Sequence, residues 1–213
     1  MKRINNFQVA PMSSNESASE TASETASEFS SIANHFLVAM PKNGSSFFAG
    51  SVVYLCGHTP DGAMGLVINK PSPIRMRQLF ESEEKPIPKR FDDQWVSLGG
   101  PVQTDRGFFI HTPIGKWNSS IIVNDDIAVT SSRDIVTGLL EDEHNAIKTV
   151  AAIGYCSWTA GQLEKEIADD FWLLAPADYN IMFDLPFFKR YDAALRSLGV
   201  SAAVRLSGAS GHA

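Results

Sequence analysis

A series of short β-rich runs beginning at residue 36 constrains the fold more than any other feature of the sequence. The runs are rich in β-branched and aromatic residues and are separated by turn-forming residues, which is typical of strands. We expect strands at 36–40, 51–56, 65–69, 95–98, 107–112, 120–123, 149–155 and, at an edge, 202–206. The Pro60-Asp61-Gly62 turn predicts a hairpin with a long loop between the second and third strands, because aspartate and glycine tolerate a positive φ.

Capping signals place four helices among these strands. Their starting signals are Ser72 with Pro73, Ser131 with Asp134, the Thr159-x-x-Gln162 capping box, and Pro186, after which the last helix runs to about Leu198 and stops at Gly199. The side chains expected to face inward are Met76, Leu79 and Phe80, then Ile135, Val136, Leu139 and Leu140, then Leu163 and Ile167, and finally Phe188, Tyr191, Leu195 and Leu198. The alternation predicts a mixed α+β fold.

The N-terminal segment differs from the rest of the chain in composition. Residues 13–31 repeat a four-residue unit of Ser or Thr, Ala, Ser and Glu, and almost none of them suits a core. We therefore expect residues 1–33 to form a disordered tail and residues 34–213 to form one folded unit or two small lobes. The chain is 44% hydrophobic over 213 residues, which is enough for a sizeable core.

Charge and composition narrow the classes of partner. The formal net charge is −6, and an acidic surface opposes phosphate contacts, so direct nucleic-acid binding is not expected. The longest apolar runs are too short for a membrane helix, and the basic start lacks the apolar stretch of a signal peptide. The chain has two cysteines, which fits a reducing compartment. The sequence thus predicts a cytoplasmic protein with no membrane association and no disulfide.

Several ordered blocks resemble one known family. The blocks HFLVAMP, GAMGLVINKP, LGGPVQTDRGF, TSSRD, GYCSWTAGQLEKEI and PAD are similar to those of the AlgH/YqgE family of bacterial proteins, and the resemblance spans residues 34–213. It implies a bent, barrel-like sheet packed with helices. Some members are labelled transcriptional regulators of exopolysaccharide synthesis, a label that does not imply contact with DNA. The resemblance brings no catalytic residue with it.

Glycine-rich and metal-ligating patterns are weak. Gly62, Gly65, Gly99 and Gly100 lack the spacing of a dinucleotide or phosphate loop and fit turns between strands, so no cofactor is expected. The run from Cys56 to Asp61 also contains His58, but a zinc site usually needs a second ligand pair, and none is present. The sequence predicts no metal site.

The run from Gly154 to Trp158 is the best enzymatic lead. It lies between a predicted strand and a capped helix, where some hydrolases expose a nucleophile on a sharp turn. That turn needs glycine at its last position, which here is Trp158, and no histidine with an acidic partner follows downstream. We expect Cys156 to be a packed, unreactive thiol, and no catalytic residue is assigned.

Polar residues at strand ends and helix starts form the stronger candidate set. The residues expected to bind a ligand or partner are Asn69, Arg106, His111, Arg133, Asp134, Trp158, Gln162 and Glu166. Arginine holds carboxylates and carbonyls in fixed geometry, so this set either ties loops to the core or binds an anionic group. Trp158, beside the capping box, is the tryptophan most suited to lining a pocket.

Three functional hypotheses follow from these residues. The first is a non-enzymatic regulatory or interaction module that acts on a protein partner or a small ligand, because the distinctive residues are glycines, caps and clamps. The second is a hydrolase or transferase that uses Cys156 or His111. The third, a transcriptional regulator that contacts DNA, has neither a helix-turn-helix signal nor a favourable charge.

Overall fold

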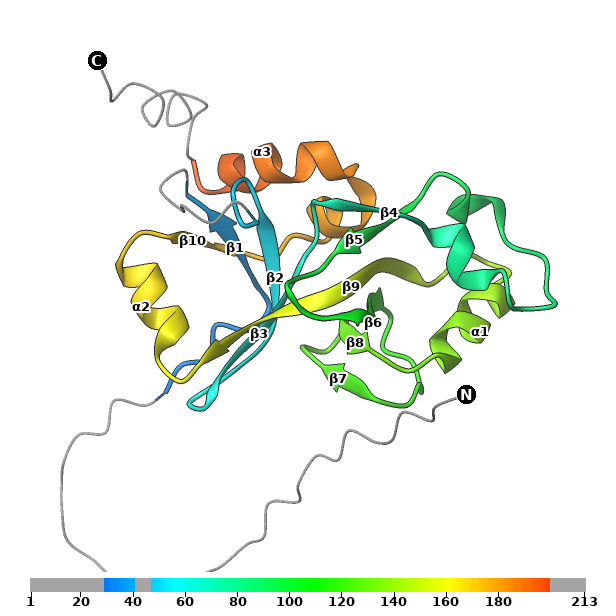
Figure 1. The fold of residues 1–213 in the computed structure, drawn as a ribbon, viewed down its shortest axis with the longest axis horizontal. Coiled ribbons are helices and arrows are strands. Elements are labelled where there is room, and N and C mark those ends of the chain that lie inside the picture. The colour runs from blue at the N-terminus through cyan, green and yellow to red at the C-terminus, as the bar shows by residue number, and fades with distance from the viewer. Residues whose placement is uncertain (1–28, 41–46, 200–213) are drawn as a thin grey trace, which may run out of the picture.

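The computed structural model describes residues 29–40 and 47–199, and its strands and helices alternate along the chain (Figure 1). The strands are β1 (His35–Ala39), β2 (Val52–Thr59), β3 (Gly62–Val67), β4 (Pro71–Arg75), β5 (Trp95–Leu98), β6 (Val102–Thr112), β7 (Ser120–Ile122), β8 (Ala128–Thr130), β9 (Lys148–Thr159) and β10 (Trp172–Pro176). The helices are α1 (Asp134–Glu141), α2 (Gln162–Ala168) and α3 (Phe187–Ser197). Short helical turns are η1 (Met76–Phe80), η2 (Lys89–Phe91) and the π-helical η3 (Asn180–Asp184).

The strands form one curled, largely antiparallel sheet, which confirms the predicted α+β class and bent sheet. Its order is β10-β1-β2-β3-β9-β6-β8-β7, and β5 joins through a parallel pair with β9 while β4 pairs with β5. Helix α2 lies at one end of the molecule, α1 at the other, and α3 covers the top (Figure 1). The sheet therefore has two halves, one built from the strands before β4 together with β10, the other from β4 to β8.

Strand β9 connects the two halves. It pairs with β3, β5 and β6. Gly154 in the middle of β9 has φ +69, and a Cβ there would overlap the carbonyl oxygen of Gly100. Only glycine combines this backbone conformation with such a close approach. The bend in β9 thus depends on the absence of a side chain at this position.

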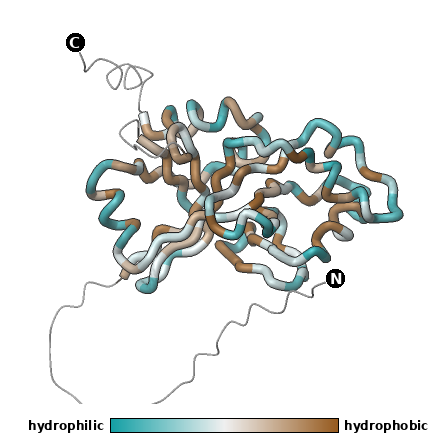
Figure 2. The backbone as a smooth tube through the Cα atoms, in the orientation of Figure 1, coloured by the Kyte–Doolittle hydropathy of each residue, from teal (hydrophilic) through white to brown (hydrophobic). Residues whose placement is uncertain are grey.

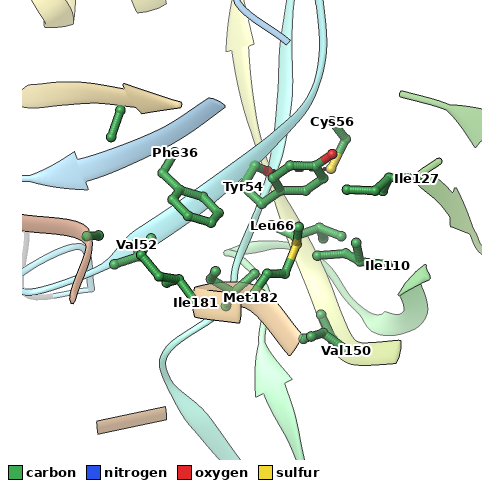
Figure 3. Packing of buried hydrophobic residues seen from close by; sticks show 14 of the residues in the cluster. Phe36, Val52, Tyr54, Cys56, Leu66, Ile110, Ile127, Val150, Ile181 and Met182 are labelled. Atoms are coloured by element: carbon green, nitrogen blue, oxygen red, sulfur yellow. Dashed lines mark hydrogen bonds between the residues drawn. The ribbon is translucent and has the colours of Figure 1, made fainter. Parts of the chain in front are cut away.

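Hydrophobic side chains gather on both faces of the curled sheet. Figure 2 shows hydrophobic stretches in strands and helices of both halves, separated by hydrophilic connections. Inside the curl, Phe36, Tyr54, Leu66 and Ile110 converge with Met182 of η3 (Figure 3), and α3 adds further apolar side chains. A second cluster lies between the first half and α2, and a third lies between the second half and α1 with η1. Burial on both faces explains why several strands are continuously apolar.

The helix expected at Ser72 and Pro73 is wrong at its start. Residues 71–75 are strand β4, and a helical turn begins only at Met76. The Ser72 hydroxyl accepts a hydrogen bond from the Ile74 amide at 3.1 Å, which gives a local turn without a helix. Pairing with β5 outweighs the capping signal, and the proline residues are tolerated because β4 is an edge strand.

Several other element predictions need correction. The hairpin between β2 and β3 is confirmed, but its loop is short, because the strands stay paired to Thr59 and Gly62. Strands β8 and β10 were not predicted, and the strand expected at 202–206 lies outside the described residues.

Phe188 is 78% exposed, not buried, since it projects from the first turn of α3 past the edge of the core. No helix among the described residues is long and apolar enough to span a membrane.

The described chain starts within the segment expected to be a tail. The Ser31 hydroxyl donates to the His58 carbonyl at 3.0 Å, and the Ile32 amide donates to His58 Nδ1 at 3.1 Å. Phe29 packs on the His58 ring at 4.8 Å. Residues 29–33 therefore lie against the end of β2, and the expected boundary at Asn34 falls inside a described segment. Residues 1–28 lie outside the described residues.

Candidate binding site

Pockets open at three places on the described part of the chain. The largest, about 620 Å³, lies between η3, the start of α3 and strands β4, β5 and β9; we call it the α3 pocket. A second, about 500 Å³, lies beside the start of α1. A third, about 290 Å³, lies between α2, β9 and β10 and is called the α2 pocket. Asn69 lines the α3 pocket, Arg133 lines the second, and Trp158, Gln162 and Glu166 line the α2 pocket, so the predicted site residues do not form one cluster.

Trp158, Gln162 and Glu166 come together in the α2 pocket. The Trp158 and Trp172 indole nitrogens both donate to Glu166 Oε2 at 2.8 Å, and Gln162 Nε2 donates to Oε1 at 2.9 Å. Gln162 Oε1 accepts from the amide and hydroxyl of Thr159, so this half of the predicted capping box is present. The Glu166 carboxylate accepts three hydrogen bonds from neutral donors of its own chain, and it ties α2 to β9 and β10.

Arg106, Arg133 and Asp134 lie around the start of α1. Arg106 Nη2 donates to the Ser131 hydroxyl at 2.7 Å, and Arg133 Nη2 donates to the Ser82 hydroxyl. Asp134 does not pair with Ser131 as a capping box; its Oδ2 accepts from the backbone and side-chain nitrogens of Asn118. Burial opposes ionisation of Asp134, but these hydrogen bonds prevail and lower its pKa. These contacts join loops to α1.

His111 and Asn69 are held in structural contacts. His111 is fully buried; its Nδ1 lies 3.0 Å from the Pro113 carbonyl oxygen and its Nε2 lies 2.8 Å from the Thr130 hydroxyl. The carbonyl can only accept, so the network assigns the proton to Nδ1 and leaves Nε2 as an acceptor. Burial lowers the His111 pKa, although the Pro113 bond opposes this. Asn69 bridges the Val52 amide and the Gly50 carbonyl at the edge of the α3 pocket.

Cys156 lies within β9 and not at an elbow. The strand continues to Thr159, so the expected junction between strand and helix at this residue is wrong. Cys156 is 1% exposed, and its Sγ donates to the Gly99 carbonyl at 3.3 Å. Burial raises the pKa of this thiol to about 12, despite a backbone hydrogen bond involving Val67 that opposes the shift. A thiolate is the nucleophilic form of cysteine, so this environment suppresses reactivity.

The residues weighed as a metal site are also separated. Cys56 is a buried free thiol whose pKa is raised by burial, and His58 Nε2 lies 2.8 Å from Glu164 Oε1. Asp61 lies in the hairpin turn beyond them. Within the described residues, no group of three or more histidine, cysteine, aspartate and glutamate side chains is arranged to hold a metal ion.

Sequence reasoning missed Arg190, which lines the α3 pocket and is only 5% exposed. Its Nε donates to the Leu185 carbonyl at 2.9 Å, Nη1 donates to the Ile68 carbonyl, and the guanidinium lies 4.7 Å from the centroid of the Phe187 ring. The available signal was its spacing: Arg190 is four residues before Ala194, on the inward stripe of α3. Charged side chains are rarely this deeply buried unless they are paired, so the position of Arg190 calls for a specific role or a specific partner.

Comparison with known proteins identifies the family. A family profile described as AlgH-like matches residues 36–203. A UPF0301 protein of Neisseria meningitidis serogroup C is 52% identical over 182 residues, covering 85% of this chain and 99% of the relative. The chain belongs to the AlgH family. This confirms the resemblance that the sequence blocks indicate.

Solved structures extend the comparison to the fold. The solution structure of the AlgH protein from Pseudomonas aeruginosa is 37% identical, covers 91% of this AlgH-family chain and 100% of its own, and superposes with a TM-score of 0.68. The crystal structure of a Corynebacterium diphtheriae protein is 18% identical, with a TM-score of 0.62, and covers 84% of this chain and 93% of its own. At that identity the second likeness concerns the fold alone.

Proposed function

We propose that this AlgH-family chain is a non-enzymatic regulatory or interaction module that binds a protein partner or a small ligand. The observation that carries the proposal is the burial of the Cys156 thiol and the His111 imidazole, the two groups that the enzymatic hypothesis would use. Cys156 is buried with a raised thiol pKa, and His111 is buried with both ring nitrogens engaged. A nucleophile or general base has to reach its substrate and be poised near neutral pH.

The remaining predicted residues support the same proposal. Glu166 and Asn69 have their polar atoms bonded to the backbone or to neutral side chains of the same chain, and Asp134 Oδ2 accepts from the backbone and side-chain nitrogens of Asn118. Such contacts fix the shape of loops and pocket walls without activating a reacting group. A rigid scaffold with shaped pockets is what a binding module needs.

Thiol labelling and complementation test this proposal. With Cys56 replaced by serine, native Cys156 is expected to label no faster than free cysteine at neutral pH, and its rate should still rise above pH 9 because its pKa is about 12. In a deletion strain, Cys156→Ala and His111→Gln variants that fold as wild type are expected to restore the wild-type proteome.

The opposite results would favour the thiol or histidine enzyme. Labelling that is fast and reaches its plateau below neutral pH would show an activated Cys156. Failure of either variant to complement, at unchanged unfolding free energy, would show that the side chain does chemistry. The Cys56→Ser background alone serves as the matched control for both measurements.

A further inference from the structure

The α3 pocket contains a buried positive charge that the described protein does not neutralise with a carboxylate. No ion pair among the described residues includes Arg190, and its two hydrogen-bond acceptors are backbone carbonyls. Burial lowers the pKa of this guanidinium to about 10, which reflects the cost of keeping the charge out of water. Carbonyl dipoles offset only part of that cost.

One edge of the Arg190 guanidinium is available to a ligand. Nε and Nη1 are engaged, whereas Nη2 makes no hydrogen bond to a described residue. Arg190 is among the residues that line the α3 pocket, so its free donor is placed where a ligand in that pocket can meet it. Because Arg190 lines the α3 pocket, a hydrogen-bond donor with a full charge is accessible there.

The walls of the α3 pocket are aromatic. Trp95, Phe183, Phe187 and Phe188 line it, and Phe188 is 78% exposed at its rim. An aromatic side chain this exposed gains little from the fold of its own chain, but it gains contact area when a ring packs against it. The volume of about 620 Å³ is within the range of small-molecule sites.

The acidic residues at the rim limit the charge of the ligand. Asp184 is neutralised by Lys148, whose Nζ lies 2.8 and 2.9 Å from its two carboxylate oxygens. Asp93 also lines the pocket, is exposed, and takes part in none of the ion pairs of the described residues. One free cationic edge opposite one unpaired carboxylate favours a singly charged anion over a phosphate dianion.

We propose that the α3 pocket binds a small aromatic molecule that carries one carboxylate, with the carboxylate on Arg190 Nη2 and the ring against Phe187 and Phe188. This inference rests on the proposed binding function and names its site and ligand class. Asn69, which bridges backbone groups at the pocket edge, positions the wall and does not contact the anion.

Calorimetric titration of the full chain with four probes tests the ligand class. Indole-3-acetate has the ring and the single charge, indole-3-acetamide has the ring without the charge, acetate has the charge without the ring, and phenyl phosphate has a ring with a dianion. We expect sub-millimolar binding of indole-3-acetate and binding at least about tenfold weaker for each other probe, since each lacks one matched feature.

Two variants locate the binding. Phe188→Ala removes an exposed ring without disturbing the core, and we expect about tenfold weaker binding of indole-3-acetate. Arg190→Lys keeps the charge but loses the planar fork and should weaken binding at least as much. Ile122→Ala, at a 66% exposed position on β7, is the matched control and should bind as wild type.

Each contrary result overturns a defined part of the inference. Equal binding of the amide removes the role of the charge, and tighter binding of phenyl phosphate replaces the carboxylate with a phosphate. Failure to bind indole-3-acetate, or binding that Phe188→Ala leaves unchanged, removes the site. If the thiol and complementation results hold while this titration fails, the binding function stands, and it is this site with its ligand class that is wrong.

Discussion

Two arginines, Arg90 and Arg190, each pack against a phenylalanine ring, but only one of them has a carboxylate that neutralises its charge. Arg90, near the end of α1, lies 4.6 Å from the Phe91 ring centroid, and Arg190 on α3 lies 4.7 Å from that of Phe187. Arg90 Nη2 pairs with Asp142 Oδ2 at 2.9 Å, with side-chain exposures of 19% and 7%. Arg190 has only backbone carbonyls.

We call the Arg90 contact closed, because Asp142 neutralises its charge, and the Arg190 contact open, because no ion pair of the described residues includes it. Asp142 also accepts hydrogen bonds from the amides of Ala146 and Ile147, so the Arg90 pair fixes the turn after α1, although Arg90 Nε is buried without a partner among the described residues. Arg190 takes part in none of the ion pairs of the described residues, and it lines the α3 pocket. A buried charge therefore indicates a binding site only when its neutralising partner is absent.

The largest expected effect comes from breaking the closed pair. Asp142→Ala should lower the free energy of unfolding by about 3 kcal/mol, because it leaves a largely buried guanidinium without its counter-charge and two backbone amides without acceptors. Urea denaturation measures the loss. Glu141→Ala, which removes an exposed ion pair with Lys85 next to it, is the control and should change little. Equal losses in both variants would contradict the role of burial.

A smaller loss is expected at the open site. Arg190→Met should cost about 1 to 2 kcal/mol, because the Leu185 and Ile68 carbonyls lose their donors while an unneutralised buried charge is removed. Lys189→Met, at the neighbouring exposed position, is the control for loss of a positive charge. A loss at Arg190 that matches the loss at Asp142 would mean that its charge is already balanced within the chain.

The dependence of stability on acid pH also distinguishes the Arg90–Asp142 pair from Arg190. Burial opposes ionisation of Asp142, but hydrogen bonds from Ile147, Ala146 and Arg90 lower its pKa below the ordinary value of 3.8. A carboxylate with a lowered folded pKa stabilises the fold above its unfolded pKa, and that stabilisation is lost as the pH falls through the folded value. The stability difference between wild type and Asp142→Asn should be constant from neutral pH to about pH 5 and shrink below it.

Unfolding measured at a series of pH values provides this difference. A gap between wild type and Asp142→Asn that is already closed above pH 5, or that is unchanged at the lowest pH, would contradict the assignment. Arg190 has no acidic partner among the described ion pairs, so Arg190→Met should show no such acid-dependent change in its stability difference.

The smallest effect is expected on the exposed face of α3, with the inward face as its comparison. Phe188→Ala should change the free energy of unfolding by no more than about 0.5 kcal/mol, because the side chain is 78% exposed. Leu195→Ala, on the inward face and 8% exposed, should cost about 2 to 4 kcal/mol. A loss of stability at Phe188 comparable to that at Leu195 would place this ring in the core and remove its role as a free pocket wall.

Local patterns predicted the elements whose signals are short-range. The β2–β3 hairpin, the apolar stripe of α1 and the Gly199 stop after α3, with φ +70, all follow from turn chemistry or helical spacing. Strand β4 was mistaken for a helix because serine and proline favour both a helix start and an edge strand. Only the pairing partner β5, more than twenty residues later in the chain, decides between them.

The candidate sites show the same limit. Spacing on one helix face correctly placed Gln162 beside Glu166, but it could not show that two tryptophans from different strands donate to that carboxylate. Cys156 seemed to precede a turn because the extent of β9 depends on pairing with β3. Arg190 was overlooked because its burial beside a pocket and its lack of an ion pair among the described residues depend on the three-dimensional fold.

The position of β9 also has a consequence for the order in which the chain can mature. This strand is central in the sheet but lies at residues 148–159, so β3, β5 and β6 are made long before their shared neighbour. During synthesis their unpaired edges are open to other chains, and such edges promote aggregation. The emerging protein therefore depends on rapid arrival of its last third, or on a chaperone that shields those edges until β9 leaves the ribosome.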